Sequence, residues 1–202
     1  MASLELFMHD PAAPGALIKA ALVHVQFETI HPFLDGNGRV GRLLIALLLH
    51  HDGVLRQPLL YLSLYFKQHR TEYYRLLDAV RASGDWEAWL DFFLQGVADT
   101  GAAAVDTAHR LLALFEADAQ AIRDVGRVAG NVLRVYDVLR RRPVATVDYL
   151  AVASEVPYAT TARAVATLTE MGLLRELTGR RRGRVFAYDR YLAILSEGAQ
   201  PL

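Results

Sequence analysis

The sequence predicts a mainly α-helical protein whose last third adds a small β-hairpin. Apolar side chains recur at helical spacing through most of the first 125 residues, whereas two short strand-like runs occur only near the C-terminus. The charge also changes along the chain, because residues 1–125 carry 10 basic and 15 acidic side chains while residues 126–202 carry 12 and 7. This asymmetry indicates two modules within the 202 residues.

The first module is predicted to be helical throughout. Pro14 and Gly15 break the chain before the first amphipathic run. The run over 38–53 is apolar on nearly all sides, which predicts a helix at the centre of a bundle. A single apolar stripe over 98–125 predicts a long helix that connects the modules. The expected helices span residues 16–28, 38–53, 61–81, 86–96 and 98–125.

The second module changes to shorter elements. A helix over 131–142 ends at Pro143, Thr146 can cap a short helix, and a third helix ends at Gly172. The segments LLREL and RVFAYD read as two strands joined by a basic turn. Three helices followed by a β-hairpin resemble a winged helix-turn-helix. The predicted domains are a helical domain at 1–96, a connecting helix at 97–125 and a winged helix domain at 126–202.

The composition excludes several classes of protein. The chain has no cysteine, which rules out disulfide scaffolds, thiol nucleophiles and iron–sulfur clusters. Its formal net charge is zero. The N-terminus lacks the pattern of a signal peptide, and the longest apolar run, Leu43 to Leu49, is far shorter than a membrane span of about 20 residues. We therefore expect a cytoplasmic protein without membrane segments.

The densest run of reactive and flexible residues is HPFLDGNGRVGR, from His31 to Arg42. Gly36 and Gly38 permit positive φ and can expose backbone N–H groups at the start of the following helix. Such amides bind anions, most naturally phosphate. Arg39 and Arg42 are three residues apart, share a helical face and can bind further phosphate oxygens.

Three other side chains of this run add chemistry. Asp35 offers the hard oxygen that Mg²⁺ takes from proteins when it accompanies phosphates. His31 can accept a proton near neutral pH. Asn37 can donate a hydrogen bond to a ligand or hold the loop. The run therefore predicts a phosphate site with a base and a metal ligand beside it.

Two other phosphate loops fit the sequence poorly. Gly36, Gly38 and Gly41 also spell the dinucleotide-binding pattern G-x-G-x-x-G, but no strand precedes them and no acid lies near Arg56, about twenty residues on. A Walker A loop needs a Gly-Lys-Ser/Thr ending, which the segment lacks.

The whole run resembles the signature of the Fic family, H-P-F-x-[D/E]-G-N-G-R-x-x-R, at every specified position. The preceding FETI and the later YLSLYFKQHRTEYYRLLDAVR are similar to helices of the same family. The resemblance extends over a Fic helical bundle and, in one large bacterial subgroup, a C-terminal winged helix. It implies transfer of AMP from ATP to a Ser, Thr or Tyr hydroxyl of a target protein, with release of pyrophosphate.

The resemblance also implies a role for each motif residue. His31 would be the general base, and Phe33 would point into the core and pin the loop. Asp35 would hold Mg²⁺ between the α- and β-phosphates. The nucleotide would be bound by the anion hole and by the polar side chains of the motif, namely Gly36, Asn37, Gly38, Arg39 and Arg42.

One feature departs from the family. Many members place an inhibitory [S/T]-x-x-x-E-[G/N] helix before the motif, whose Glu pairs with the second motif arginine. The thirty residues before His31 contain no such pattern, nor the expected flap that aligns the target. We therefore expect Arg42 to lack that inhibitory partner, so that nucleotide binds freely while target modification is in doubt.

The winged helix offers fewer candidate contacts. The expected recognition helix exposes one basic residue, Arg163, whereas four arginines load the turn between the strands. This distribution suits phosphate or minor-groove contact better than the reading of base edges. DNA binding and protein docking both remain open, as does a homodimer. The arginines of the turn are Arg180, Arg181, Arg182 and Arg184.

The leading hypothesis is thus a protein adenylyltransferase that uses ATP and Mg²⁺. The alternatives are a Fic enzyme that transfers another nucleotide or a phosphate, and a nucleotide-sensing, DNA-binding regulator. Outside the motif, His24 is expected to be structural, and Tyr73 or Tyr74 is a candidate for the adenine pocket.

Overall fold

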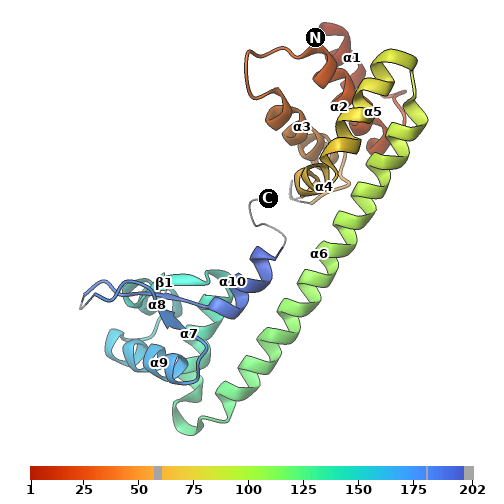
Figure 1. Ribbon diagram of the computed structural model, residues 1–202. Helices are drawn as coiled ribbons and strands as arrows, with labels where there is room; N and C mark the ends of the chain where they lie inside the picture. The colour runs from red at the N-terminus through yellow and green to blue at the C-terminus, as the bar shows by residue number, and fades with distance from the viewer. Residues whose placement is uncertain (57–60, 181, 198–202) are drawn as a thin grey trace. The chain divides into compact units, whose positions relative to one another are not determined.

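The computed structural model describes residues 1–56, 61–180 and 182–197, and it confirms a mainly α-helical fold with a small sheet (Figure 1). The chain forms two compact units, Met1–Ala104 and Val105–Leu202. The boundary between the two units falls, along the sequence, inside the segment that we predicted as the connecting helix. In the described part of the chain, no helix is both long and apolar enough to cross a membrane.

The first unit is a bundle of helices. Its core gathers around Trp89 and Phe93, which are fully buried, and the indole N–H of Trp89 donates to the carbonyl of Ala21 at 3.1 Å. The helices are α1 (Ala2–Met8), α2 (Ala16–Ile30), α3 (Asn37–His51), α4 (Leu62–Gln68), α5 (Arg70–Ser83) and the beginning of α6 (Trp86–Arg123).

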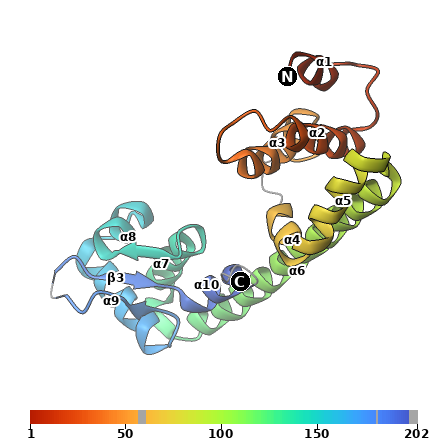
Figure 2. The same cartoon turned by 45° about the horizontal axis from the view of Figure 1, so that its top comes forward.

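The central helix of this unit is α2, which runs beside α3 (Figure 2). We predicted that the helix over 38–53 would lie at the centre of the bundle, buried on nearly all sides. This prediction was wrong, because one face of the helix is exposed to solvent. Leu43 and Leu47 of α3 are 55% and 46% exposed, whereas Ala20 and Ala21 of α2 are fully buried. Small side chains let neighbouring elements approach α2 closely, so α2 rather than α3 is enclosed.

Two helix boundaries also differ from the prediction. The segment 61–81 is broken into α4 and α5 at His69, whose ring Nδ1 lies 3.0 Å from the carbonyl oxygen of Tyr65. The segments 86–96 and 98–125 form one continuous helix, α6. Gly96 does not interrupt α6, and a Cβ atom there would lie 2.6 Å from the Tyr65 ring. This glycine serves close packing rather than helix termination.

The second unit contains the predicted three helices and hairpin. Thr146 caps α8 as expected, because its hydroxyl accepts the Tyr149 N–H at 3.2 Å. Strand β1 and helix α10 were not predicted. The three strands form an antiparallel sheet in the order β1-β3-β2. The elements are a short 3-10 turn (Gly126–Val128), α7 (Ala129–Arg141), β1 (Val144–Thr146), α8 (Val147–Ser154), α9 (Tyr158–Glu170), β2 (Arg175–Glu176), β3 (Val185–Ala187) and α10 (Asp189–Ser196).

A buried polar cluster links the C-terminal part of α6 to α7 and to the start of α10. Asp118 is 3% exposed, accepts the hydroxyl of Tyr188 and pairs with Arg190 at 2.8 Å. Tyr136 of α7 lies 3.0 Å from the Tyr188 hydroxyl. Because the hydroxyl of Tyr188 is buried, it depends on Asp118 and Tyr136 for its hydrogen bonds.

Replacing Asp118 by Ala should therefore lower the free energy of unfolding by about 2 kcal/mol, since the Tyr188 hydroxyl loses its buried acceptor. Urea unfolding followed by circular dichroism measures this loss. Asp106→Ala is the matched control on the same helix, because the Asp106 side chain is 69% exposed and faces Arg110 at 3.8 Å. The control should change stability by less than about 0.5 kcal/mol. Equal effects of the two substitutions would contradict the role of the cluster.

Candidate functional site

The predicted base, His31, lies at the end of α2 in an uncommon backbone conformation. Its φ and ψ are 49° and 58°, the left-handed region, and its N–H donates to the carbonyl of Phe27 at 3.0 Å. The residue is exposed. A non-glycine residue held in this region costs of order 1 kcal/mol or more, and such strain is concentrated at functional positions.

The loop after His31 turns directly into the N-terminus of α3. Gly36 adopts φ of 83° and caps this helix, so a side chain there would be strained. Helix α3 begins at Asn37, and the first intrahelical bond is donated by Val40 to the Gly36 carbonyl. The backbone N–H groups before Val40 therefore have no partner within the helix and point toward its N-terminal end. This is the arrangement that binds anions.

The side chain of Asn37 holds the loop closed. Its Oδ1 accepts the Phe33 N–H at 2.9 Å, and its Nδ2 donates to the Phe33 carbonyl at 2.6 Å. Asn37 is 2% exposed. Of the two roles considered for this amide, these bonds favour the one that holds the loop.

Phe33 does not point into the core as the family resemblance implied. It is 51% exposed, and its ring lies 6.3 Å from that of Phe27, measured between centroids. The expectation was wrong because the loop is pinned by the backbone of Phe33, through Asn37, and not by its ring.

Asp35 lies against the groups that would receive an anion. Its Oδ1 accepts the Gly36 N–H at 2.7 Å, and its Oδ2 lies 3.4 Å from Nη2 of Arg39. Both side chains are largely exposed. Among the described residues, no three His, Asp or Glu side chains gather as a metal site. A single exposed carboxylate beside a phosphate site fits Mg²⁺, which usually takes one or two carboxylates and completes its shell with phosphate and water.

Arg42, the second motif arginine, lies over a buried polar layer between α2 and α3. A Cβ atom on Gly38 would be 3.1 Å from Nη1 of Arg42 and 3.8 Å from Oε1 of Glu28. A Cβ atom on Gly41 would be 2.6 Å from the same Glu28 oxygen and 3.2 Å from the His24 ring. The motif glycines therefore permit α3 to lie directly on these two side chains.

The layer contains groups that burial has made unusual. His24 is fully buried, and its Nε2 lies 2.8 Å from the Tyr73 hydroxyl. Burial lowers the pKa of His24 to about 4, which keeps its ring neutral. Burial also raises the pKa of the Glu28 carboxyl, against the opposing charges of Arg42, His31 and Arg81. The pKa of Tyr73 is raised by burial and, second, by the charge of Glu28.

The sequence analysis assigned no role to Glu28. It is part of the FETI segment, four residues after His24 and three before His31. Polar residues at i, i+4 and i+7 share one face of a helix, and this pattern could have placed all three beside the motif. Tyr73, a candidate for the adenine pocket, is 3% exposed and belongs to the same layer, whereas Tyr74 is 51% exposed.

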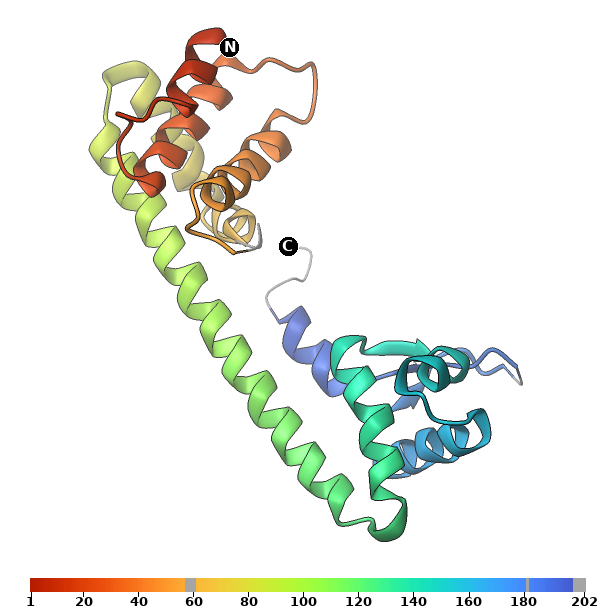
Figure 3. The same cartoon turned by 180° about the vertical axis from the view of Figure 1, so that it is seen from behind.

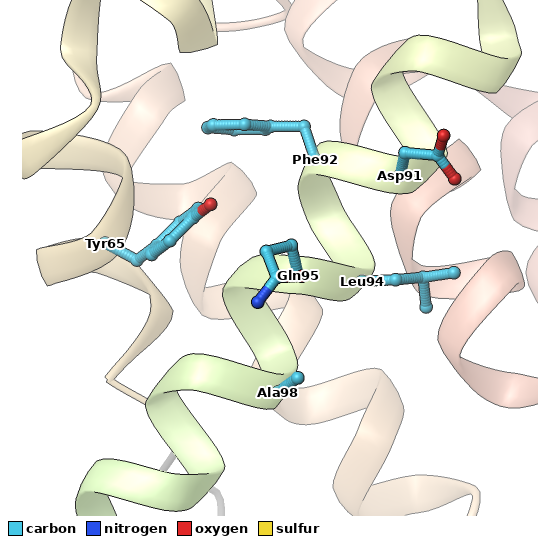
Figure 4. Close-up of a pocket in the computed structure, with 6 residues that line it drawn as sticks. All are labelled: Tyr65, Asp91, Phe92, Leu94, Gln95 and Ala98. Atoms are coloured by element: carbon cyan, nitrogen blue, oxygen red, sulfur yellow. The ribbon is translucent and has the colours of Figure 1, made fainter.

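One hollow of the first unit lies away from the motif. It has a volume of about 650 Å³ and is lined by one residue of α4 and several of α6 (Figure 4). The Tyr65 ring closes one side of it. The motif site is therefore defined by its polar groups and not by this pocket. The lining residues are Tyr65, Asp91, Phe92, Leu94, Gln95 and Ala98.

The candidate contacts of the second unit lie on one helix and one loop. Arg163 is exposed on α9, and Arg180, Arg182 and Arg184 are exposed in the loop between β2 and β3, which projects from the helices of its unit (Figure 3). The guanidinium carbon of Arg184 lies 5.4 Å from the centroid of the Phe186 ring. Arg181 lies outside the described residues. Contact of these arginines with DNA or a protein stays a prediction.

Comparison with known proteins finds similarity to one family in the N-terminal segment. Residues 1–49 match the model of the Fic/DOC family. A probable protein adenylyltransferase of Aquifex aeolicus is 54% identical over 37 residues, which are 18% of this chain and 12% of the relative. The protein adenylyltransferase Fic of Aedes aegypti is 41% identical over 90 residues, 45% of this chain and 16% of the relative. The matched segments thus cover less than a fifth of these relatives.

A solved structure is similar over most of the chain. A Fic family protein from Desulfovibrio desulfuricans G20 superposes with a TM-score of 0.50 at 22% sequence identity, covering 93% of this chain and 53% of that one. At this identity the similarity supports the fold.

Titration of His24 should reveal its burial. The ring of an unfolded chain takes up a proton near pH 6.5, whereas in the folded protein the pKa is about 4. The unfolded state therefore binds more protons as the pH falls through 6.5, and the stability that neutral His24 provides is lost between pH 6.5 and 4. The loss should reach about 3 kcal/mol at pH 4. A midpoint near 6.5 in an NMR titration of the His24 ring would contradict this.

Substitution of Gly41 by Ala should separate α2 from α3. The new methyl group would lie too close to Glu28 and the His24 ring, so we expect a net loss of about 1–2 kcal/mol in the free energy of unfolding. Gly101→Ala is the control, because Gly101 lies in α6 with nothing within 4 Å of a Cβ atom. Alanine there should stabilise the helix by about 0.5–1 kcal/mol. If both variants gain stability, the close approach at Gly41 is not a constraint.

Proposed function

We propose that this chain is a protein adenylyltransferase, which transfers AMP from ATP to a Ser, Thr or Tyr hydroxyl of a target protein, because residues 1–49 match the Fic/DOC family model and the chain is similar over short stretches to protein adenylyltransferases. One observation carries the proposal: within the complete HPFLDGNGRVGR run, a short loop joins the exposed His31 at the end of α2 to the N-terminus of α3. A base and an anion site are thereby held together.

His31 and the N-terminus of α3 have separate roles in the proposed reaction. His31 accepts the proton of the target hydroxyl as its oxygen forms a bond to the α-phosphorus of ATP. The bond from the α-phosphorus to the oxygen that bridges to the β-phosphorus breaks, and pyrophosphate leaves. The free N–H groups at the start of α3 lie where they can stabilise the charge on the transferred phosphate. Positioning and charge stabilisation are the main demands of such transfers.

The arginines and the acid of the motif account for the rest of the nucleotide. Arg39 and Arg42 are placed on the first turns of α3 and would bind the β- and γ-phosphates. Asp35 would hold Mg²⁺, which when bound neutralises charge on the phosphates. Its present contacts with Gly36 and Arg39 keep the carboxylate at the same end of α3.

Two other readings are weaker. Transfer of a phosphate is less favoured because the GNGR run is intact, and relatives that phosphorylate tend to depart from it. A nucleotide-sensing regulator would use the exposed arginines of the second unit to bind DNA. That unit could equally dock a protein, and its role is a separate proposal.

Incubation of the purified chain with Mg²⁺ and ATP labelled at the α-phosphate should transfer label to protein, with a mass gain of one AMP in intact mass spectrometry. The His31→Ala variant should lose at least about 100-fold in rate, because the base is absent. The matched control is His51→Ala, an exposed histidine at the other end of α3. Label from the γ-phosphate instead would identify a kinase. Equal labelling of parent and His31→Ala would refute the assignment of the base.

A further inference from the structure

A buried carboxylate with one oxygen that has no hydrogen-bond partner lies next to the motif. Glu28 is 9% exposed, and its Oε1 accepts no hydrogen bond from any described group. An unpaired buried charge is costly, and a protein keeps one only where nearby charges compensate for it. The positive groups that act on Glu28 are Arg42, His31 and Arg81.

Arg42 lies beside this carboxylate. Nη1 of Arg42 and Oε1 of Glu28 are both near the position that a Cβ atom of Gly38 would take, at 3.1 and 3.8 Å from it. Within the described residues, Arg42 forms no ion pair shorter than 4 Å. Glu28 thus acts on the guanidinium through space, from beneath α3.

Tyr73 offers Arg42 a second, fixed group. Its ring is stacked on Phe66, with 4.7 Å between centroids, and its hydroxyl is 2.8 Å from Nε2 of His24. Since His24 is neutral, its Nε2 can accept the hydroxyl proton, which leaves the lone pairs of the Tyr73 oxygen for a donor. The charge of Arg42 also acts on the Tyr73 hydroxyl, where it opposes the rise in pKa that burial causes.

We propose that Glu28 and Tyr73 are positioning residues for Arg42, and that they hold its guanidinium where it can bind the terminal phosphates of a nucleoside triphosphate. The inference rests on the proposed function for the role of Arg42. Neither residue touches the nucleotide. Glu28, on α2, attracts the Arg42 guanidinium by its charge. Tyr73, on α5, orients the guanidinium through its hydroxyl.

Calorimetric titration of the full chain with ATP and with AMP tests the proposal. Tyr73→Phe keeps the stacked ring and the net charge, and should weaken ATP binding by about 3- to 10-fold through a displaced Arg42. Glu28→Gln keeps the shape and should weaken it by about tenfold, because Arg42 then loses the attraction of the carboxylate. AMP binding should be unchanged in both. Glu87→Gln, which alters an exposed acid of the same unit, is the control.

The same substitutions in an Arg42→Ala background distinguish a failure of the positioning role from a failure of the proposed function. If Glu28 and Tyr73 act through Arg42, neither substitution should weaken ATP binding further in that background. If Arg42→Ala weakens ATP binding while the Tyr73 and Glu28 variants do not, the positioning role is overturned and the proposed function stands. Tighter ATP binding by Glu28→Gln would also overturn it, since the carboxylate would then compete with phosphate for Arg42. If Arg42→Ala leaves ATP binding unchanged, the proposed function loses its phosphate ligand.

A nucleotide-free measurement decides the positioning role in that last case. The Nε–H resonance of Arg42, assigned by its absence from Arg42→Ala, should shift or broaden in Glu28→Gln and in Tyr73→Phe and stay in place in Glu87→Gln. Circular dichroism and thermal unfolding show whether each variant is folded, and Glu28→Asp, which keeps the charge, should restore part of the parent signal. An unchanged resonance in both variants would overturn the proposal whatever the nucleotide does.

Discussion

The close approach of α2 and α3 is the constraint on which the candidate site depends. Gly41 leaves no space for a side chain against Glu28 and His24, so the backbone of α3 lies directly on an acid and an imidazole. The two helices carry the two halves of the site, because α2 ends at His31 and α3 begins after Gly36. Their separation sets the distance from the proposed base to the proposed anion site at the N-terminus of α3.

The polar layer between these helices is a costly way to fill a core. Burial keeps His24 neutral, and Oε1 of Glu28 has no hydrogen-bond partner. The hydroxyl of Tyr73 is hydrogen-bonded to His24. Apolar side chains of similar volume would pack there at lower cost. A protein retains such groups where they orient something that must be held precisely in place, and the nearest candidate is Arg42. On the positioning role that we propose, this layer of the core would support function as well as stability.

The sequence predicted what is local and missed what depends on packing. The run from His31 to Arg42 is continuous, so its base, glycines and arginines could be recognised together, and Thr146 could be recognised as a cap from its place before an apolar run. Tyr73 meets His24 across 49 positions of chain, and no spacing rule predicts that pair. The central helix was misidentified for the same reason, because burial of α2 follows from which neighbours pack against its alanines.

Asp35 would compete with any anion that binds at this site, because its carboxylate contacts the same groups. The carboxylate already lies on the Gly36 N–H and near the Arg39 guanidinium, and its tether to the chain gives it a high local concentration. An incoming phosphate must therefore exchange with a resident anion. Weakly binding ions such as chloride or acetate compete poorly with a tethered carboxylate, whereas a triphosphate gains several contacts at once. Through this competition with Asp35, the loop would favour a triphosphate over small anions.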